Sequence, residues 1–183
     1  KSELEQSDPE LAEIVGNFAF DEVLRYGELD ERTRRMTLLA SAIALQAEGV
    51  YRSLLDAALD GGVTPVEVKE VVYQGTAYLG IGRTLPFIRA VNEVLEERGI
   101  ELPLEGQATT TFETRLTAGN QVQIDYFGEG MRETWLHGPS ERAHINKWLA
   151  DNCFGDYYTR NGLSDRDREM ITFCFIAAQG GCE

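Results

Sequence analysis

The sequence predicts an all-α protein built from helical bundles. Apolar residues recur at intervals of three or four over most of the chain. Helix-start signals, in which a capping residue precedes a proline and an acidic residue, occur at Ser7–Glu10 and again at Thr64–Glu67. Glycines stand where helices would end, as at Gly61–Gly62. Together these patterns favour helices and short turns throughout.

Five helices are expected in the first half of the chain. The first begins after Ser7 and runs to about Arg25, and Asp30 is suited to cap the second. From Met36 onward the second helix is apolar on nearly every face, so we expect it in the centre of a bundle. The next three are expected at about 50–59, from Thr64 to Gly80 behind a capping box, and at 83–98.

The helical periodicity is interrupted at the start of the second half of the chain. Residues 99–119 contain Pro103, Gly106 and three consecutive threonines, which is typical of a linker or a short extended arm. Helical spacing resumes over 122–131 and again over 139–158. A turn is expected at 161–162.

One segment of the chain repeats another at a constant offset. Leu29–Met36 matches Leu163–Met170 in its leucine, arginine and methionine positions, 134 residues later. We interpret this match as an internal duplication. It predicts a first helical unit at 8–98, a linker at 99–119 and the N-terminal part of a second, incomplete unit at 120–183. The last three helices of that second unit are expected to follow Glu183.

Composition narrows the classes of function. The chain of 183 residues has ordinary globular composition, and no stretch approaches the roughly 18 apolar residues of a membrane span. The first residues lack a signal-peptide core, so a cytoplasmic protein is expected. A net charge of −14 disfavours nucleic acid as a partner. The three cysteines form no Cys-x-x-Cys, and His137 and His144 have no third ligand in view, so no metal is expected.

Two stretches of the sequence carry motifs of a known family. The first is Gly62–Val71 followed by Ala77–Leu85, and the second combines Gly130–Arg132, Cys153–Leu163 and Arg166–Arg168. They resemble the two halves of the carboxymuconolactone decarboxylase domain, which shares its fold with alkylhydroperoxidase D. The resemblance implies tandem helical-bundle units, a small-molecule substrate, no cofactor, and a homo-oligomer that is trimeric or hexamer-like.

The thiol branch of that family works through a Cys-x-x-Cys pair, a following histidine and a glutamate one helix earlier. Cys182 and its neighbours are similar to the start of this motif, and Glu169 matches the relay glutamate, although one extra residue separates them. A thiolate near a helix N-terminus would act as the nucleophile. Alternatively, Gly180–Gly181 only ends a helix and Cys182 is a small buried residue. The first unit has neither cysteine nor histidine.

In the decarboxylase branch, acid and histidine side chains replace the thiol pair. Glu48 stands 134 positions before Cys182 in an otherwise apolar segment, which would favour the protonated acid. It is the candidate to protonate the carbon that CO2 leaves. Arg83 and Arg160 are candidates to hold substrate carboxylates. The alternatives are a solvent-exposed helix end for Glu48 and packing against an acidic neighbour for each arginine.

Three hypotheses of function follow. The first is a decarboxylase-like carbon–carbon lyase that acts on a small carboxylated lactone or ring acid. The second is a thiol peroxidase or disulfide reductase of the alkylhydroperoxidase D type, with an antioxidant role. Because the first unit lacks the catalytic thiol pair, the third is a degenerate, non-catalytic member of the family.

Overall fold

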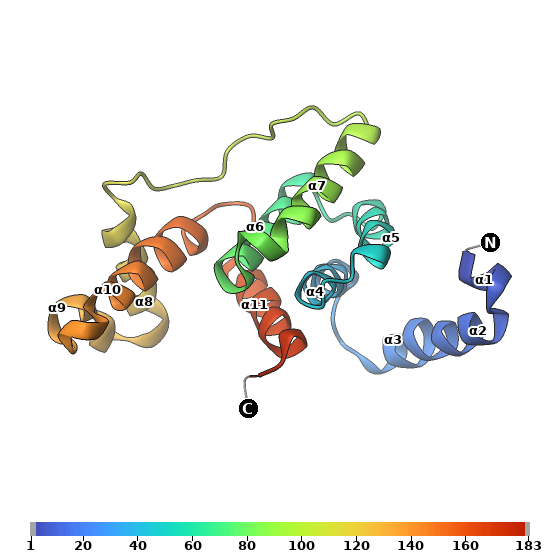
Figure 1. Ribbon diagram of the computed structural model, residues 1–183, viewed down its shortest axis with the longest axis horizontal. Coiled ribbons are helices and arrows are strands. Elements are labelled where there is room, and N and C mark those ends of the chain that lie inside the picture. The colour runs from blue at the N-terminus through green and yellow to red at the C-terminus, as the bar shows by residue number, and fades with distance from the viewer. Residues whose placement is uncertain (1–2, 182–183) are drawn as a thin grey trace. The chain divides into compact units, whose positions relative to one another are not determined.

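The computed structural model describes residues 3–181, and all regular structure in that range is helical (Figure 1). The all-α class expected from the sequence is therefore confirmed. The chain divides into an N-terminal segment that ends at Asp30 and a larger body that begins at Glu31. None of the described helices has the length and apolar character that crossing a membrane requires.

The N-terminal segment consists of consecutive short helices: α1 (Glu3–Ser7), α2 (Pro9–Asn17), η1 (Phe18–Glu22) and α3 (Val23–Tyr26). Pro9 occupies the first turn of α2, where its missing N–H costs no hydrogen bond. The predicted helix up to about Arg25 is confirmed, but η1 is a π-helical turn inside it. Sequence periodicity does not distinguish such a turn from continuous α-helix.

Five longer helices form the core of the larger body. They are α4 (Glu31–Ala44), α5 (Glu48–Asp60), α6 (Pro65–Leu79), α7 (Ile81–Glu97) and α11 (Asp165–Gln179). Helix α4 packs against α5, α6 and α11, and α11 also packs against α6 (Figure 1). The segment expected to open a second unit therefore shares its core with the first four of these helices.

Helix α4 has one buried face rather than several. Met36, Leu39 and Ile43 are at most 1% exposed, as their helical spacing predicts. Leu38 and Leu45 are 42% and 63% exposed. The expectation that α4 is enclosed in the centre of a bundle is therefore wrong for these two leucines, because no other described element of the larger body covers that side.

The start of α6 is fixed by its own sequence. The Thr64 hydroxyl accepts a hydrogen bond from the Glu67 backbone N–H at 3.2 Å, and the Glu67 carboxylate accepts one from the Thr64 N–H at 2.7 Å. This reciprocal capping box satisfies two N–H groups that the helix itself leaves without partners. The prediction made for this position is confirmed.

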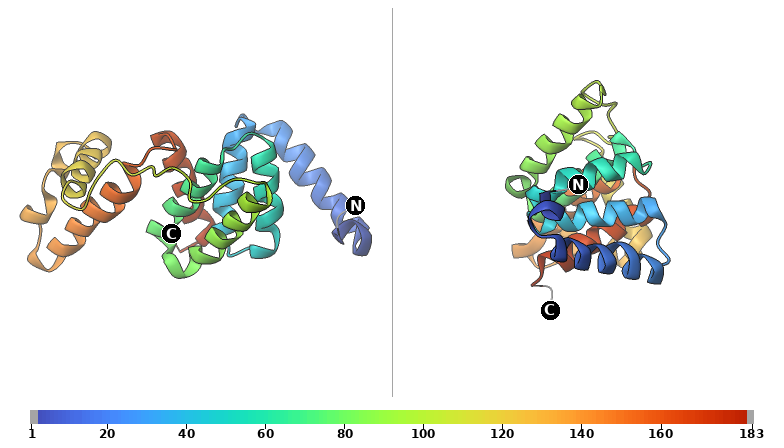
Figure 2. Two further views of the ribbon diagram at one scale, coloured as in Figure 1. Left: turned by 90° about the horizontal axis from the view of Figure 1, so that it is seen from above. Right: turned by 90° about the vertical axis from the view of Figure 1, so that its right-hand side faces the viewer.

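The remaining elements lie between α7 and α11. Residues 98–114 form turns and extended chain, and α8 begins at Arg115, inside the range expected to be linker. The elements that follow are α8 (Arg115–Phe127), η2 (Glu129–Met131), α9 (Thr134–His137), η3 (Ser140–Arg142), α10 (Ala143–Trp148) and η4 (Leu149–Tyr158). Figure 2 shows α8 beside the continuous helix formed by α10 and the π-helical η4.

Two glycines allow α8 and η4 to approach closely. A Cβ atom on Gly119 would overlap the backbone of Ala150 and Gly155, and one on Gly155 would overlap the Arg115 carbonyl. Backbone atoms cannot turn away as a flexible side chain can. Any larger residue at either position would therefore separate the two helices.

Candidate functional site

Glu48 is the first residue of α5, directly after a tight turn from α4. In this turn Gln46 has a φ of 56°, a left-handed conformation that is uncommon outside glycine. Its side-chain amide donates hydrogen bonds to the carbonyls of Ile43, at 2.6 Å, and Arg83, at 3.3 Å. A conformation of this kind persists only where surrounding contacts hold it. The turn thus fixes the position at which Glu48 leaves the core.

Glu48 lies at the edge of a hollow of about 430 Å³ between α5 and α7, which we call the Glu48 hollow. Its lining residues are Glu48, Tyr51, Arg52, Pro86, Phe87, Arg89, Ala90 and Glu93. The Glu48 side chain is exposed, so the apolar surroundings expected from its sequence neighbours are not found. The structure matches the alternative of a helix-end residue in contact with solvent, here at the edge of a hollow.

Two arginines line the Glu48 hollow with different partners. Arg52 forms ion pairs with Glu97 and, at 3.7 Å, with Glu93. Arg89 is exposed and has no ion-pair partner among the described residues. Because arginine remains charged at any ordinary pH and can pair with a carboxylate through two hydrogen bonds, Arg89 is the group in this hollow best placed to receive an anion.

Tyr51 is the buried polar residue of the Glu48 hollow. It is 1% exposed, and its ring meets the ring of Phe87 edge-on, with centroids 4.8 Å apart. Its hydroxyl has no hydrogen-bond partner in the described structure. Burial raises the pKa of the hydroxyl, so the group stays protonated and is a hydrogen-bond donor at neutral pH. An unsatisfied buried hydroxyl is rare and indicates a place where a partner is missing.

Arg83 lies in a different hollow, of about 460 Å³, formed where α4 and α11 both end. Its lining residues are Ala44, Leu45, Gln46, Arg83, Ala178, Gln179, Gly180 and Gly181. The Arg83 side chain is exposed and has no ion-pair partner among residues 3–181. The expected acidic neighbour is therefore absent from the described chain. Cys182 lies outside the described residues, directly after Gly181.

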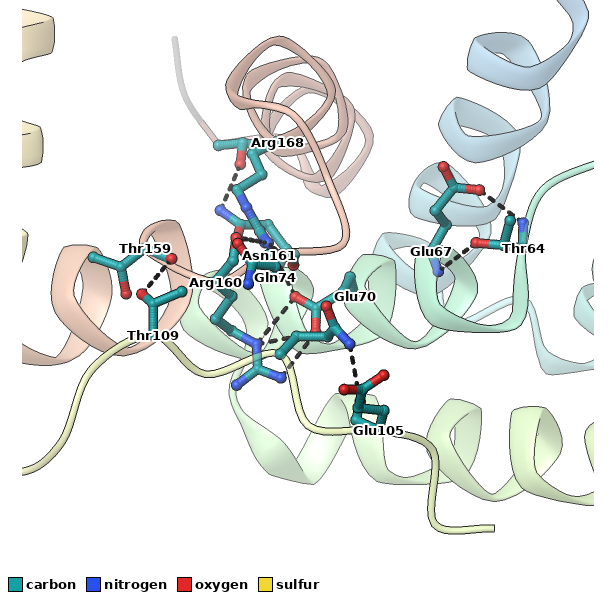
Figure 3. A network of polar contacts seen from close by, with 12 residues as sticks. Thr64, Glu67, Glu70, Gln74, Glu105, Thr109, Thr159, Arg160, Asn161 and Arg168 are labelled. Carbon is teal, nitrogen blue, oxygen red and sulfur yellow. Dashed lines mark hydrogen bonds and ion pairs between the residues drawn. The ribbon is translucent and has the colours of Figure 1, made fainter. Parts of the chain in front are cut away.

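Arg160 is bound to a carboxylate of the chain itself (Figure 3). Its Nε and Nη2 atoms donate to both carboxylate oxygens of Glu70 at 2.9–3.0 Å, and its guanidinium lies 5.1 Å from the ring centre of Tyr73. The side chains of Arg160 and Glu70 are 17% and 1% exposed. The alternative of packing against an acidic neighbour thus describes Arg160 correctly. Arg160 also lines a hollow of about 720 Å³ beside Tyr158 and Asp165, away from Glu48.

A second arginine completes this buried network. Arg168 is fully buried and donates to Glu70 at 3.1 Å and to the carbonyls of Arg160 and Asn161 at 2.8 and 3.0 Å (Figure 3). From the sequence, the charged run 165–169 is expected to be a solvated or ion-paired first turn of a helix, and only Glu169 is a candidate for function. In the structure, Arg168 of this run is buried instead. The motif Arg166–Arg168 marked Arg168 in the sequence, but its partner Glu70 lies 98 positions earlier, so the sequence did not reveal the pairing.

Glu169 is exposed and lies near a cluster of hydroxyl and thiol groups. The Tyr78 and Tyr158 hydroxyls are 2.6 Å apart, and the negative charge of Glu169 contributes to the raised pKa of both. Burial raises the pKa of the Cys153 thiol to about 11; a hydrogen bond with Tyr78 opposes this rise, and the charge of Glu169 adds a smaller contribution to it. Cys153 is therefore a thiol rather than a thiolate at neutral pH and a weak nucleophile.

The structure brings Glu48 together with residues that the sequence did not single out. Tyr51 lies one helical turn after Glu48, and this spacing could have indicated that the two share a face. Nothing in the sequence connected Arg89 to Glu48, because α5 and α7 meet only in the folded chain. Arg83, Arg160 and Glu169 line or border other parts of the molecule.

The fold and the Glu48 hollow define a small all-α protein with a pocket of the size that accommodates a small organic molecule. Residues 9–93 match the family described as "Carboxymuconolactone decarboxylase family". The matched range contains Glu48, Tyr51, Arg83 and Arg89.

A stretch of the chain is also similar to a known protein. The chain is 30% identical over 87 residues to "4-carboxymuconolactone decarboxylase" of Acinetobacter baylyi (strain ATCC 33305 / BD413 / ADP1). The match covers 48% of this chain and 65% of the relative, so the chain spans less than two thirds of the relative's length. Arg160 and Glu169 lie outside the range matched by the family.

Proposed function

We propose that the Glu48 hollow is the active site of a decarboxylase-like lyase that acts on a small carboxylated lactone or ring acid without a cofactor. The observation that carries this proposal is that an acid, an unpaired arginine and a buried unpartnered hydroxyl line one hollow of about 430 Å³. The family of residues 9–93 and the decarboxylase relative support it.

Each group has a role in such a reaction. Arg89 pairs with the substrate carboxylate and sets its position. As the carbon–carbon bond breaks, CO2 leaves and its electron pair passes into the conjugated lactone, which becomes a dienolate. The Tyr51 hydroxyl, kept protonated by burial, donates a hydrogen bond to the developing oxyanion. Glu48 then passes a proton taken from solvent water to the carbon that lost CO2.

The test is turnover of 4-carboxymuconolactone by the full chain, followed as CO2 release. Glu48→Gln is expected to lower kcat about 100-fold or more, since a positioned acid typically contributes 10²–10⁴. Arg89→Ala is expected to raise KM more than it lowers kcat. Leu38→Ala, an exposed change on α4 outside the hollow, is the matched control and is expected to keep wild-type kinetics. Turnover unchanged by Glu48→Gln overturns the proposal.

A duplicated architecture supports placing the site at this turn. Helices α4 and α11 begin 134 positions apart, at Glu31 and Asp165. The left-handed residues after them, Gln46 and Gly180, have φ values of 56° and 75° and are also 134 positions apart. We propose that α11 opens a second unit of the same kind. The equivalent of Glu48 in that unit is Cys182.

The thiol reaction remains the alternative and rests on Cys182 alone. The two described cysteines do not favour it, because burial raises the pKa of both Cys153 and Cys174. Peroxide consumption that is lost in Cys182→Ser would favour the thiol enzyme. Lactone turnover that survives Cys182→Ser favours the lyase. A chain with neither activity is the non-catalytic family member.

A further inference from the structure

The Glu48 hollow has an aromatic base and a charged rim. Tyr51 and Phe87, each 1% exposed, form the base. The charged lining residues are exposed and form the rim, and they are Glu48, Arg52, Arg89 and Glu93. A base of this kind accommodates the ring of a small organic acid, and the few charges placed around it decide which charged groups that acid can carry.

The rim charges form two sets, one on each helix. Glu48 and Arg52 are four positions apart on α5 and therefore share a helix face. Arg89 and Glu93 have the same spacing on α7. Arg52 meets Glu93 across the hollow at 3.7 Å, and further ion pairs join the last residues of α5 to the end of α7. The two helices thus run in the same direction, and Glu48 and Arg89 lie toward the same end of the hollow.

The two ends of the hollow differ in the charge that they present to a ligand. At one end Arg52 is paired with Glu93 and also with Glu97, so two carboxylates already balance its charge. At the other end Arg89 forms no ion pair with any residue that the structure describes. A ligand therefore meets one free arginine. A second carboxylate on that ligand would lie near Glu93, where like charges repel, or would have to displace Glu93 from Arg52.

We propose that the Glu48 hollow selects acids with a single carboxylate and that Glu93 and Glu97 exclude diacids. The inference rests on the proposed function, because it assigns the substrate class of the same site. The substrate carboxylate pairs with Arg89, its ring lies against Tyr51, and its other substituents are uncharged. 4-Carboxymuconolactone carries two carboxylates, so it is expected to be a poorer substrate than the same lactone ring with one.

Binding of unreactive acids tests the selectivity separately from the reaction. The probes are 2-furoate and furan-2,5-dicarboxylate, which share a ring and differ by one carboxylate, each titrated into the full chain by calorimetry. The monoacid is expected to bind at least about tenfold more tightly, because a second carboxylate lies near Glu93. Arg89→Gln is expected to weaken monoacid binding about tenfold or more, since it removes the paired cation.

Freeing Arg52 is expected to reverse the preference. Glu93→Gln with Glu97→Gln removes both carboxylates that pair with Arg52, and it is expected to strengthen diacid binding at least about tenfold. Monoacid binding at the other end is expected to change by less than about threefold. Circular dichroism checks that the variant keeps its helices.

The matched control removes two carboxylates outside the hollow. Glu96→Gln with Glu101→Gln, both at exposed positions, changes the net charge equally and is expected to keep the wild-type preference. The inference is overturned by a wild type that binds the diacid as tightly as the monoacid. It is also overturned if freeing Arg52 strengthens diacid binding no more than this control does.

Turnover distinguishes the inference from the proposed function. The lactone with one carboxylate is 5-oxo-2,5-dihydrofuran-2-carboxylate, and its kcat/KM is expected to exceed that of 4-carboxymuconolactone at least about tenfold. Monoacid selectivity in binding without turnover of either lactone supports the selectivity and overturns the lyase. Turnover that depends on Glu48 but prefers the diacid overturns the selectivity and leaves the lyase in place. If the wild type binds neither furan acid, both proposals are wrong.

Discussion

Glu70→Gln removes a buried negative charge from between two arginines while keeping the shape of the side chain. The side chains of Glu70 and Arg168 are 1% and 0% exposed, so neither can turn to water when the charge is lost. Removing one partner of a buried ion pair typically costs about 3–5 kcal/mol. Arg168 keeps hydrogen bonds to two backbone carbonyls, so we expect the lower end, about 3 kcal/mol. Urea unfolding followed by circular dichroism measures this loss.

A loss of about 3 kcal/mol would be a large part of the total stability, because whole domains are stable by only about 5–15 kcal/mol. Glu101→Gln, at an exposed glutamate, is the matched control and is expected to change stability by less than about 0.5 kcal/mol. If Glu70→Gln lost less than about 1 kcal/mol with an unchanged slope of the unfolding curve, the network would not be the buried, mutually dependent one described here.

Two further predictions concern packing and the thiol of η4. Gly119→Ala places a methyl group against the Ala150 and Gly155 backbones, and it is expected to lower the free energy of unfolding in urea by about 1–3 kcal/mol. Gly130→Ala is the control, because a Cβ atom at Gly130 meets open space. Equal losses of stability in the two variants would contradict the close approach of α8 and η4. Cys153, whose pKa is raised to about 11, is expected to react with iodoacetamide slowly at pH 7 and faster as the pH rises toward 11. A reaction of the native protein that levels off near pH 8.5 would show instead an ordinary exposed thiol.

Because Arg160 belongs to the buried network, it is poorly suited to bind a substrate carboxylate. Its guanidinium is already engaged through two nitrogens by Glu70, which balances its charge. A second carboxylate there would compete with a buried partner, whereas Arg83 and Arg89 have no such partner among the described residues. The two free arginines are therefore better suited to bind an anion, and only Arg89 shares a hollow with Glu48.

Much of the helical architecture follows from the sequence because its signals are local. The capping box at Thr64, the proline at the start of α2 and the glycine after α6 each act on the adjoining turn. They set helix boundaries whatever the rest of the chain does. The apolar spacing in α4 likewise identified its buried face, but not that Leu38 and Leu45 stay uncovered. That depends on which neighbour packs there.

The site depends on contacts that no local signal encodes. Arg168 meets Glu70 across 98 positions, and Arg89 reaches the hollow of Glu48 because α7 packs against α5. The sequence by itself determined that the chain is helical, where most helices begin and which residues repeat at an offset of 134. Only the tertiary structure decided which charged residues are buried as partners and which remain free, since burial and pairing result from packing between distant segments.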